Sequence, residues 1–229
     1  MNIDRLVAYC EENLGDPDLW HTPDGYPGSL ALCIIDALYS TGSHYTSVVN
    51  VINRYRRKYP EENHGPQDLL ESMRVVGGAR AWAEDVVENV KPAHTGRNAR
   101  LKAEVIEQAA ELMCERSIAT VADFRGAVAR DLYDNDVRTG WLGLPSQSSG
   151  VTYNYMLLLV GLPSIKPDRM VLRFLADALG EDADLSEKQA VELLERTAER
   201  MNVDAGALDH IVWRAASGRE LTVEGERRS

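Results

Sequence analysis

The stretch Leu144-Pro-Ser-Gln-Ser-Ser-Gly150 is the most informative part of this chain, together with the segment Lys166-Pro-Asp168-Arg169 that follows it. Proline, serine and glycine in the first stretch are typical of a tight polar turn. The apolar run from Met156 to Val160 lies between the two segments, and Asp168 stands just before another apolar run. This order predicts a hairpin, an apolar segment and then a carboxylate at the start of a further helix.

The composition is that of a globular protein with an acidic charge. Of the 229 residues 44% are hydrophobic, which is enough for a core, and the formal net charge is −11. The longest apolar run is far too short to cross a bilayer, and no N-terminal run has the pattern of a secretory signal. We therefore expect no membrane contact and a cytoplasmic location. Three cysteines, an odd number at distant positions, are expected to be reduced and mostly buried: Cys10, Cys33 and Cys114.

Helical periodicity recurs along the whole chain, whereas strand patterns are scarce. Ser29 and Thr120 are suited to cap helices, and Ser186 with Gln189 forms a capping box. Apolar residues at helical spacing fall within residues 3–14, 30–39, 48–55, 101–113, 121–128, 171–175, 190–194 and 208–213. The sequence therefore predicts an all-α fold.

Polar stretches separate the predicted helices. Residues 75–80 and 91–100 have the composition of loops, and the second of these is locally basic. The longest stretch without convincing helical periodicity runs from Tyr133 to Gly150. Because long ordered loops often carry binding and catalytic residues, we expect the functional site to involve this stretch.

The hairpin and the segment after it carry a resemblance to a known family. Leu144-Pro145 opens the turn, and Ile165-Lys-Pro-Asp168-Arg-Met-Val-Leu-Arg173 supplies a hydrophobe, a proline, an aspartate and an apolar helix with an arginine. This arrangement resembles that of the helix-hairpin-helix DNA glycosylases. The resemblance implies a two-lobed helical fold with a cleft between the lobes. It implies one domain over residues 1–220, in which a middle lobe of about 45–160 contains the hairpin and the N- and C-terminal helices form the other lobe, followed by a tail at 221–229.

The resemblance extends over most of the chain. Leu30–Tyr55 is similar to the family's early apolar helix, its base-probing loop and the helix behind it, and Lys102-Ala103 is similar to a Lys-Ala pair in a later helix. Residues 207–218 resemble the closing helix, and no four-cysteine cluster follows, so no iron–sulfur cluster is expected. Bifunctional members have a lysine where this chain has Gly150. The resemblance therefore implies base excision without lyase activity.

Two carboxylates are the catalytic candidates. The resemblance implies that Asp168 is the catalytic carboxylate, which stabilises the sugar cation as the N-glycosidic bond breaks or orients the attacking water. An N-cap of the following helix is the alternative interpretation. Asp36 interrupts an apolar run and falls near the general-acid position of adenine-mismatch members of the family. A hydrogen-bonded helix residue that faces a loop is an equally good interpretation of Asp36.

The resemblance also implies the residues that contact DNA. In the hairpin these are Ser146, Gln147, Ser148, Ser149 and Gly150, whose backbone amides would hold a phosphate, with a monovalent cation at the hairpin as the only cofactor considered. The base-probing loop would contribute Thr41, His44 and Tyr45, although an ordinary helix-to-helix turn also fits that sequence. The family has glycines where this chain has Ser146 and Ser148. No metal site is predicted, because the five histidines are scattered without ligand spacing.

The leading hypothesis from the sequence is a monofunctional DNA glycosylase that acts on a modified or mismatched base. Its partner would be DNA, although a net charge of −11 is unusual for a protein that neutralises phosphates. The main alternative is a protein of the same fold that has lost catalysis and binds a nucleic acid or a protein partner. An enzyme acting on a small molecule is a third possibility. The sequence does not set the oligomeric state.

Overall fold

The computed structural model of this chain describes residues 3–20, 25–162, 169–180, 185–218 and 220–222, apart from the side chains of residues 45, 169, 187 and 188. Within these ranges the secondary structure is helical, and the only β pairing is at two isolated bridges. This confirms the predicted all-α class. The helices are α1 (Ile3–Asn13), the 3-10 turn η1 (Pro17–Leu19), α2 (Leu30–Ser40), α3 (Tyr45–Lys58), α4 (Pro66–Val76), α5 (Ala79–Asp85), α6 (Lys102–Glu115), α7 (Val121–Val128), α8 (Asp136–Leu142), α9 (Val151–Leu159), α10 (Arg169–Leu179), α11 (Glu187–Met201) and α12 (Ala205–Ala216).

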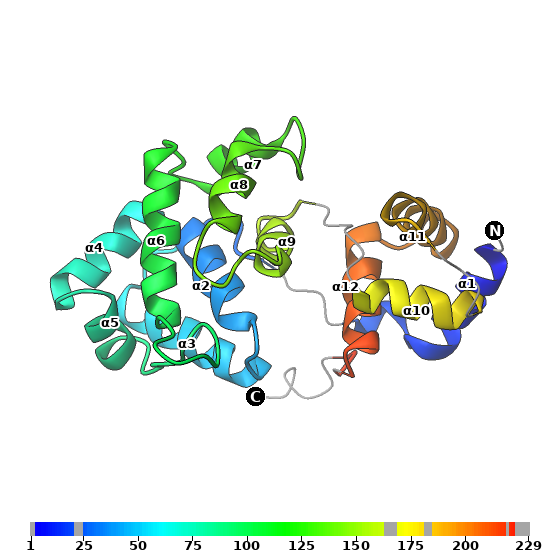
Figure 1. Cartoon of the computed structure of the whole chain (residues 1–229), viewed down its shortest axis with the longest axis horizontal. Helices are drawn as coiled ribbons and strands as arrows, with labels where there is room; N and C mark the ends of the chain where they lie inside the picture. The colour runs from blue at the N-terminus through cyan, green and yellow to red at the C-terminus, as the bar shows by residue number, and fades with distance from the viewer. Residues whose placement is uncertain (1–2, 21–24, 163–168, 181–184, 219, 223–229) are drawn as a thin grey trace. The chain divides into compact units, whose positions relative to one another are not determined.

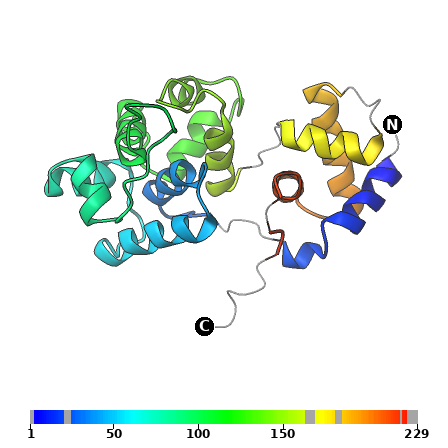
Figure 2. The same ribbon diagram turned by 60° about the horizontal axis from the view of Figure 1, so that its bottom comes forward.

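The chain divides into two compact units. A central unit comprises residues 25–162, and a terminal unit combines residues 1–24 with residues 163–229. The first helix and the last three therefore belong together, although they are far apart in the sequence (Figures 1 and 2). The sequence interpretation began the middle lobe at about residue 45, whereas the central unit begins at Gly25. The reason is that α2 packs against α3, α4, α6 and α9 of that unit.

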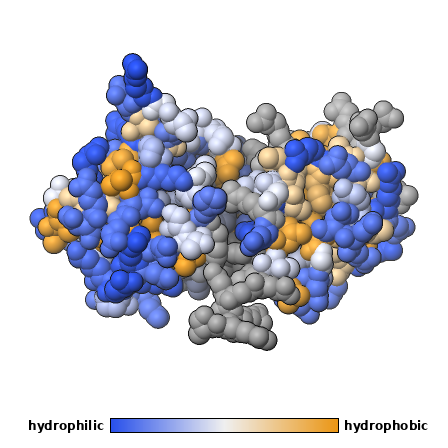
Figure 3. All heavy atoms as spheres, turned by 90° about the horizontal axis from the view of Figure 1, so that it is seen from below, coloured by the Kyte–Doolittle hydropathy of each residue, from blue (hydrophilic) through white to orange (hydrophobic). Residues whose placement is uncertain are grey.

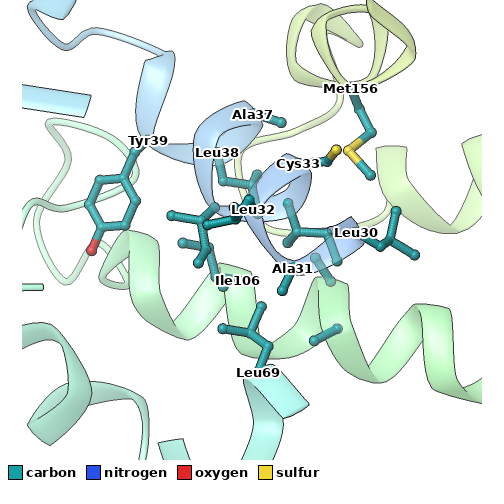
Figure 4. Packing of buried hydrophobic residues seen from close by; sticks show 14 of the residues in the cluster. Leu30, Ala31, Leu32, Cys33, Ala37, Leu38, Tyr39, Leu69, Ile106 and Met156 are labelled. Carbon is teal, nitrogen blue, oxygen red and sulfur yellow. The ribbon is translucent and has the colours of Figure 1, made fainter. Parts of the chain in front are cut away.

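The core of the central unit is built around α2. Ten of its eleven residues, from Leu30 to Tyr39, are buried. A helix that is apolar on all sides has to be enclosed by other elements, and α2 is enclosed in this way. Figure 4 shows Leu69 of α4, Ile106 of α6 and Met156 of α9 around it. The predicted cap is confirmed, since Ser29 Oγ accepts a hydrogen bond from the Leu32 N–H at 3.2 Å.

The terminal unit has its own core, formed by one face of each of its helices. Trp20 is anchored there by a hydrogen bond from its Nε1 to the Leu14 carbonyl at 2.8 Å. The capping box of Ser186 and Gln189 is present as predicted. The buried apolar residues of the terminal unit are Leu6, Cys10, Leu14, Trp20, Val171, Phe174, Leu175, Ala178, Ala190, Leu193, Leu194, Ala198, Leu208, Ile211 and Val212.

Three helices lie in stretches that showed no convincing helical pattern. The interpretation of residues 75–80 as a loop was partly wrong, since α4 ends at Val76 and α5 starts at Ala79. Helix α8 lies within the long stretch of 133–150. Helices α5 and α8 have seven residues each, barely two turns, which is too short for an apolar stripe to be recognised. Helix α4 is instead marked by its ends, with Asp68 accepting from the Gly65 N–H at 2.8 Å and Gly77 in the left-handed region.

One face of the described surface is mostly polar. On the face drawn in Figure 3, hydrophilic side chains predominate and apolar ones form separate patches. Large hydrophobic residues that remain exposed are scattered, as is usual for globular proteins: Leu19, Val75, Val90 and Val151. Among the described helices, none has the length and apolar character needed to cross a membrane.

Candidate nucleic-acid interface

The hairpin that the sequence predicted connects α8 to α9. Two turns follow each other, closed by hydrogen bonds from the Gln147 N–H to the Leu144 carbonyl at 3.1 Å and from the Gly150 N–H to the Gln147 carbonyl at 3.0 Å. Ser146 and Gly150 have positive φ angles of 65° and 75°. Ser146 thus occupies a conformation that favours glycine, at a cost of roughly 1 kcal/mol.

The hairpin residues divide into an inward and an outward set. The Gln147 side chain is buried, where its Oε1 accepts from the Thr152 hydroxyl and its Nε2 donates to the Pro145 carbonyl at 3.1 Å. It therefore holds the turn together and does not face a ligand. Ser146, Ser148 and Ser149 are exposed.

Helix α9 begins directly at the hairpin without a side-chain cap. Its N-cap is Gly150, and no side chain accepts hydrogen bonds from the first turn. The first backbone N–H groups of a helix have no partner within the helix, and they carry the positive end of its dipole. Val151, in this first turn, is 37% exposed. Such an end is suited to an anion such as a phosphate.

The loop from Thr41 to His44, which follows α2, is held by a buried ammonium group. Lys102, only 3% exposed, donates from Nζ to the carbonyls of Leu38 at 2.7 Å, Tyr39 at 3.0 Å and Thr41 at 2.6 Å. All three donors of the ammonium are therefore used at the C-terminal end of α2, where the helix dipole is negative. Burial is the main cause that lowers the pKa of Lys102 to about 8, and the nearby Lys91 cation lowers it further.

A second lysine binds the same loop from outside. Lys91 donates from Nζ to the Gly42 carbonyl and, at 3.1 Å, to the Ser43 hydroxyl. Thr41, Gly42 and His44 are exposed, so the two lysines fix the backbone and leave the tip accessible. Sequence reasoning identified both lysines, as a family pair and as part of a basic stretch, but not this role. No local signal could have done so, because the contacts span about fifty residues or more of sequence.

The structure brings this loop and the hairpin together. A cavity of about 10 Å³, roughly the size of one water, is lined by residues of both: Leu38, Thr41, Ala93, Lys102, Val105, Ser146 and Gln147. Two of the regions singled out in the sequence are thus neighbours on the central unit. The basic loop of 91–100 adjoins them through Lys91 and Ala93, and its His94, Arg97 and Arg100 are exposed.

The acidic charge of the chain is unevenly distributed between the units. Residues 25–162 contain 14 basic and 16 acidic side chains, whereas the terminal unit contains 11 basic and 20 acidic ones. Most of the net charge of −11 therefore belongs to the terminal unit. The central unit, which holds the hairpin and the Thr41 loop, is close to neutral.

Asp36 is enclosed by hydroxyl groups. It is 6% exposed and accepts from the Tyr26 hydroxyl at 2.7 Å and the Ser40 hydroxyl at 2.8 Å. Burial raises the pKa of Asp36, while hydrogen bonds from Tyr26, Ser40 and Tyr155 act in the opposite direction. The carboxyl group does not line the small cavity between the Thr41 loop and the hairpin. This geometry is that of the hydrogen-bonded helix residue considered from the sequence, and the role of Asp36 as general acid stays a prediction.

Two predicted site residues cannot be placed. Asp168 and the side chain of Tyr45 lie outside the described residues. The apolar helix predicted after Asp168 is present as α10, which starts at Arg169. In the described part of the chain, no three His, Cys, Asp or Glu side chains come together as a metal site would require.

Comparison with known proteins places the chain in a family. The curated proteins and the solved structures gave no significant match. One family model, described as a domain of unknown function (DUF8548), matches residues 4–217. Because this match covers nearly all of the 229 residues, the chain belongs to the DUF8548 family.

Proposed function

We propose that this protein is a DNA glycosylase-like protein of the helix-hairpin-helix type, which hydrolyses the N-glycosidic bond of a modified or mismatched base and leaves the strand intact. The observation that carries the proposal is the proximity of the hairpin and the Thr41 loop on one unit. One is suited to hold a phosphate and the other to probe the base stack. Thr41 and the hairpin residues are about one hundred positions apart in the sequence, so it is the tertiary fold that brings them together.

The path of the chain supports the same proposal. The resemblance implies two lobes, one of which is made by the N- and C-terminal helices while the middle of the chain forms the other. The division into a discontinuous terminal unit and a central unit of residues 25–162 is compatible with that plan.

The hairpin supplies the contacts that a phosphate needs. The uncapped first turn of α9 offers backbone N–H groups and a positive dipole end, and Ser148 and Ser149 add exposed hydroxyl groups beside it. These contacts position the duplex without reading its sequence. Arg97 and Arg100 lie in the loop that adjoins the Thr41 loop, where they would neutralise further phosphates.

Catalysis would rest on Asp168 and a flipped nucleotide. The extruded base costs a few kcal/mol of stacking, which a plug from the Thr41 loop would offset. The ionised Asp168 would stabilise the positive charge that develops on the sugar or orient the attacking water. Gly150 has no amine, so no Schiff base with the sugar would form there and no strand cleavage is expected. Asp36, if it donates a proton to the leaving base, would have to exchange one of its hydroxyl partners for the base.

The test is base excision on duplexes that carry a panel of modified and mismatched bases. We expect release of one base class by the wild type, with intact strands, and loss of at least 100-fold in rate in Asp168→Asn. The matched control is Asp177→Asn, which removes the same charge from an exposed position on α10. Equal activity of Asp168→Asn and wild type would exclude the assigned role of Asp168.

A catalytically inactive DNA-binding protein is the second candidate, and Ser146 favours it. Ser146 has a left-handed backbone conformation, and its side chain stands at a position where a glycine would let a phosphate approach the backbone closely. This candidate predicts salt-sensitive binding to a duplex with an abasic-site analogue, but no base release from any duplex of the panel. The same two measurements therefore separate the two candidates.

A further inference from the structure

A second concave site lies in the central unit, at the other end of α2 from the Thr41 loop. It is a groove of about 420 Å³ between the segment that precedes α2 and the last turn of α3. This volume lies within the range of small-ligand pockets, and none of the residues in the candidate DNA interface lines it. The groove therefore calls for an explanation of its own.

Three tyrosines form the wall of the groove, and their hydroxyl groups are already engaged by the protein. Tyr26 donates to Asp36 at 2.7 Å, Tyr55 shares a hydrogen bond with His64 Nδ1 at 3.1 Å, and Tyr59 donates to the Ser72 carbonyl at 3.4 Å. The rings of Tyr55 and Tyr59 are 5.1 Å apart. Tyr55 is buried behind the other two, so a ligand in the groove meets the half-buried rings of Tyr26 and Tyr59, which favour a flat or apolar group.

The end of α3 places cations beside this wall. Arg56 lines the groove, with its guanidinium 5.3 Å from the centre of the Tyr26 ring. Within the described residues, no ion pair joins Arg56, Arg57 or Lys58 to a carboxylate, in contrast to Arg54, which pairs with Glu88 at 3.1 Å. The helix dipole accounts for basic residues at this end of a helix, but not for an aromatic groove next to them.

The acidic residues on the rim do not neutralise Arg56. Glu61 is bound to His64 Nε2 at 3.2 Å, and Glu62 has no ion pair among the described residues. Among the described residues Arg56 therefore has no carboxylate partner, and from its place beside the Tyr26 ring the guanidinium can bind phosphate oxygens through paired hydrogen bonds.

We propose that this groove binds a nucleotide, whose base stacks on Tyr26 and Tyr59 while its phosphate is bound by Arg56. Aromatic rings beside cations are the combination with which proteins hold nucleotides irrespective of base pairing. The site is separate from the hairpin and the Thr41 loop and does not depend on the proposed excision activity. Its nucleotide comes either from solution or from a single strand, and both sources present the same chemistry.

The test is a titration of the ¹⁵N-labelled full chain with a 2′-deoxynucleoside monophosphate, followed by amide chemical shifts. We expect shifts in residues 25–32 and 55–62, and an affinity at least tenfold weaker in Arg56→Gln and in Tyr59→Ala. The control is Arg74→Gln, which removes another exposed arginine, on α4 and outside the groove, and leaves the affinity unchanged. Unchanged spectra of the backbone elsewhere show that each variant is folded.

A short single-stranded oligonucleotide provides the second arm. Binding at least tenfold tighter than that of the mononucleotide, at the same amides, assigns the groove to a strand, and equal affinity assigns it to a free nucleotide. No shift at millimolar nucleotide, shifts confined to the Thr41 loop and hairpin, or full affinity of Arg56→Gln would each overturn the proposal.

Discussion

At the scale of single residues, Lys102 shows how a buried charge organises a loop. Three carbonyls at the end of α2 depend on its ammonium group, and no other side chain donates to them in the described structure. Replacement by methionine keeps the apolar stem but leaves these carbonyls without a donor. We expect the free energy of unfolding of Lys102→Met to fall by about 1–3 kcal/mol at pH 7 in chemical denaturation. Lys91 is half-buried and binds the same loop, and the free energy of unfolding of Lys91→Met should fall by less than about 1 kcal/mol. An equal fall in both variants would contradict the special role of Lys102.

The pKa of Lys102 gives this residue a pH signature. Because its folded-state pKa is about 8 and its ordinary value is 10.5, the unfolded chain binds more protons between these two values. The contribution of Lys102 to stability therefore rises as the pH rises from 8 to 10.5. The ordinary pKa values of tyrosine and cysteine fall in the same range, so the informative quantity is the difference between wild type and variant. The stability of wild type minus that of Lys102→Met should increase across this window, and a constant difference would exclude the shift.

Asp36 has the opposite dependence. Burial raises its folded-state pKa above 3.8, so the folded chain binds more protons than the unfolded chain between these values. The contribution of Asp36 is complete below pH 3.8 and is lost as the pH rises through the folded-state pKa. In urea denaturation, Asp36→Asn should therefore gain stability relative to wild type as the pH is raised from 3 to 7. A pH-independent difference between the two would show that the carboxyl group is not shifted by burial.

At the scale of elements, the hairpin contains a residue with backbone strain, Ser146. Ser146 has a φ of 65°, whereas Ser148, two residues later, has no positive φ. Ser146→Gly should raise the free energy of unfolding by about 0.5–1 kcal/mol, because glycine adopts this conformation without a steric cost. Ser148→Gly is the matched control and should be neutral or destabilising. A gain of the same size in both variants, measured by thermal or chemical unfolding, would show that backbone strain is not the cause.

Sequence patterns predicted most of the long helices and missed α4, α5 and α8. The apolar residues of α2 and α6 and the caps at Ser29, Thr120 and Ser186 were sufficient to place those helices, because length and capping chemistry are local properties. Helix α8 was not predicted because the position of its seven residues depends on packing against α6. A Cβ atom on Gly140 would lie 2.5 Å from a methyl group of Leu112. The same holds for the site. Hairpin residues were found from composition, whereas the inward position of Gln147 and the two lysine contacts depend on the tertiary fold.

At the scale of the whole molecule, the hairpin and the Thr41 loop, which would contact phosphates, lie on the unit that carries little of the net charge. The central unit is almost balanced, with 14 basic and 16 acidic side chains, and the excess of acidic residues lies in the terminal unit. Binding should therefore depend on a few local cations and not on the total charge of −11.

This distribution predicts how salt affects the binding of a duplex with an abasic-site analogue. Each phosphate contact contributes about 0.9 to the slope of log K against log salt concentration. Arg97→Gln, in the exposed loop next to the Thr41 loop, should reduce the magnitude of that slope by about 1, because one contact is lost. Arg200→Gln removes an exposed arginine of the terminal unit, which pairs with Asp4 at 2.9 Å, and should leave the slope unchanged. Equal effects of the two variants would mean that binding responds to overall charge, and that the central unit does not contain the interface.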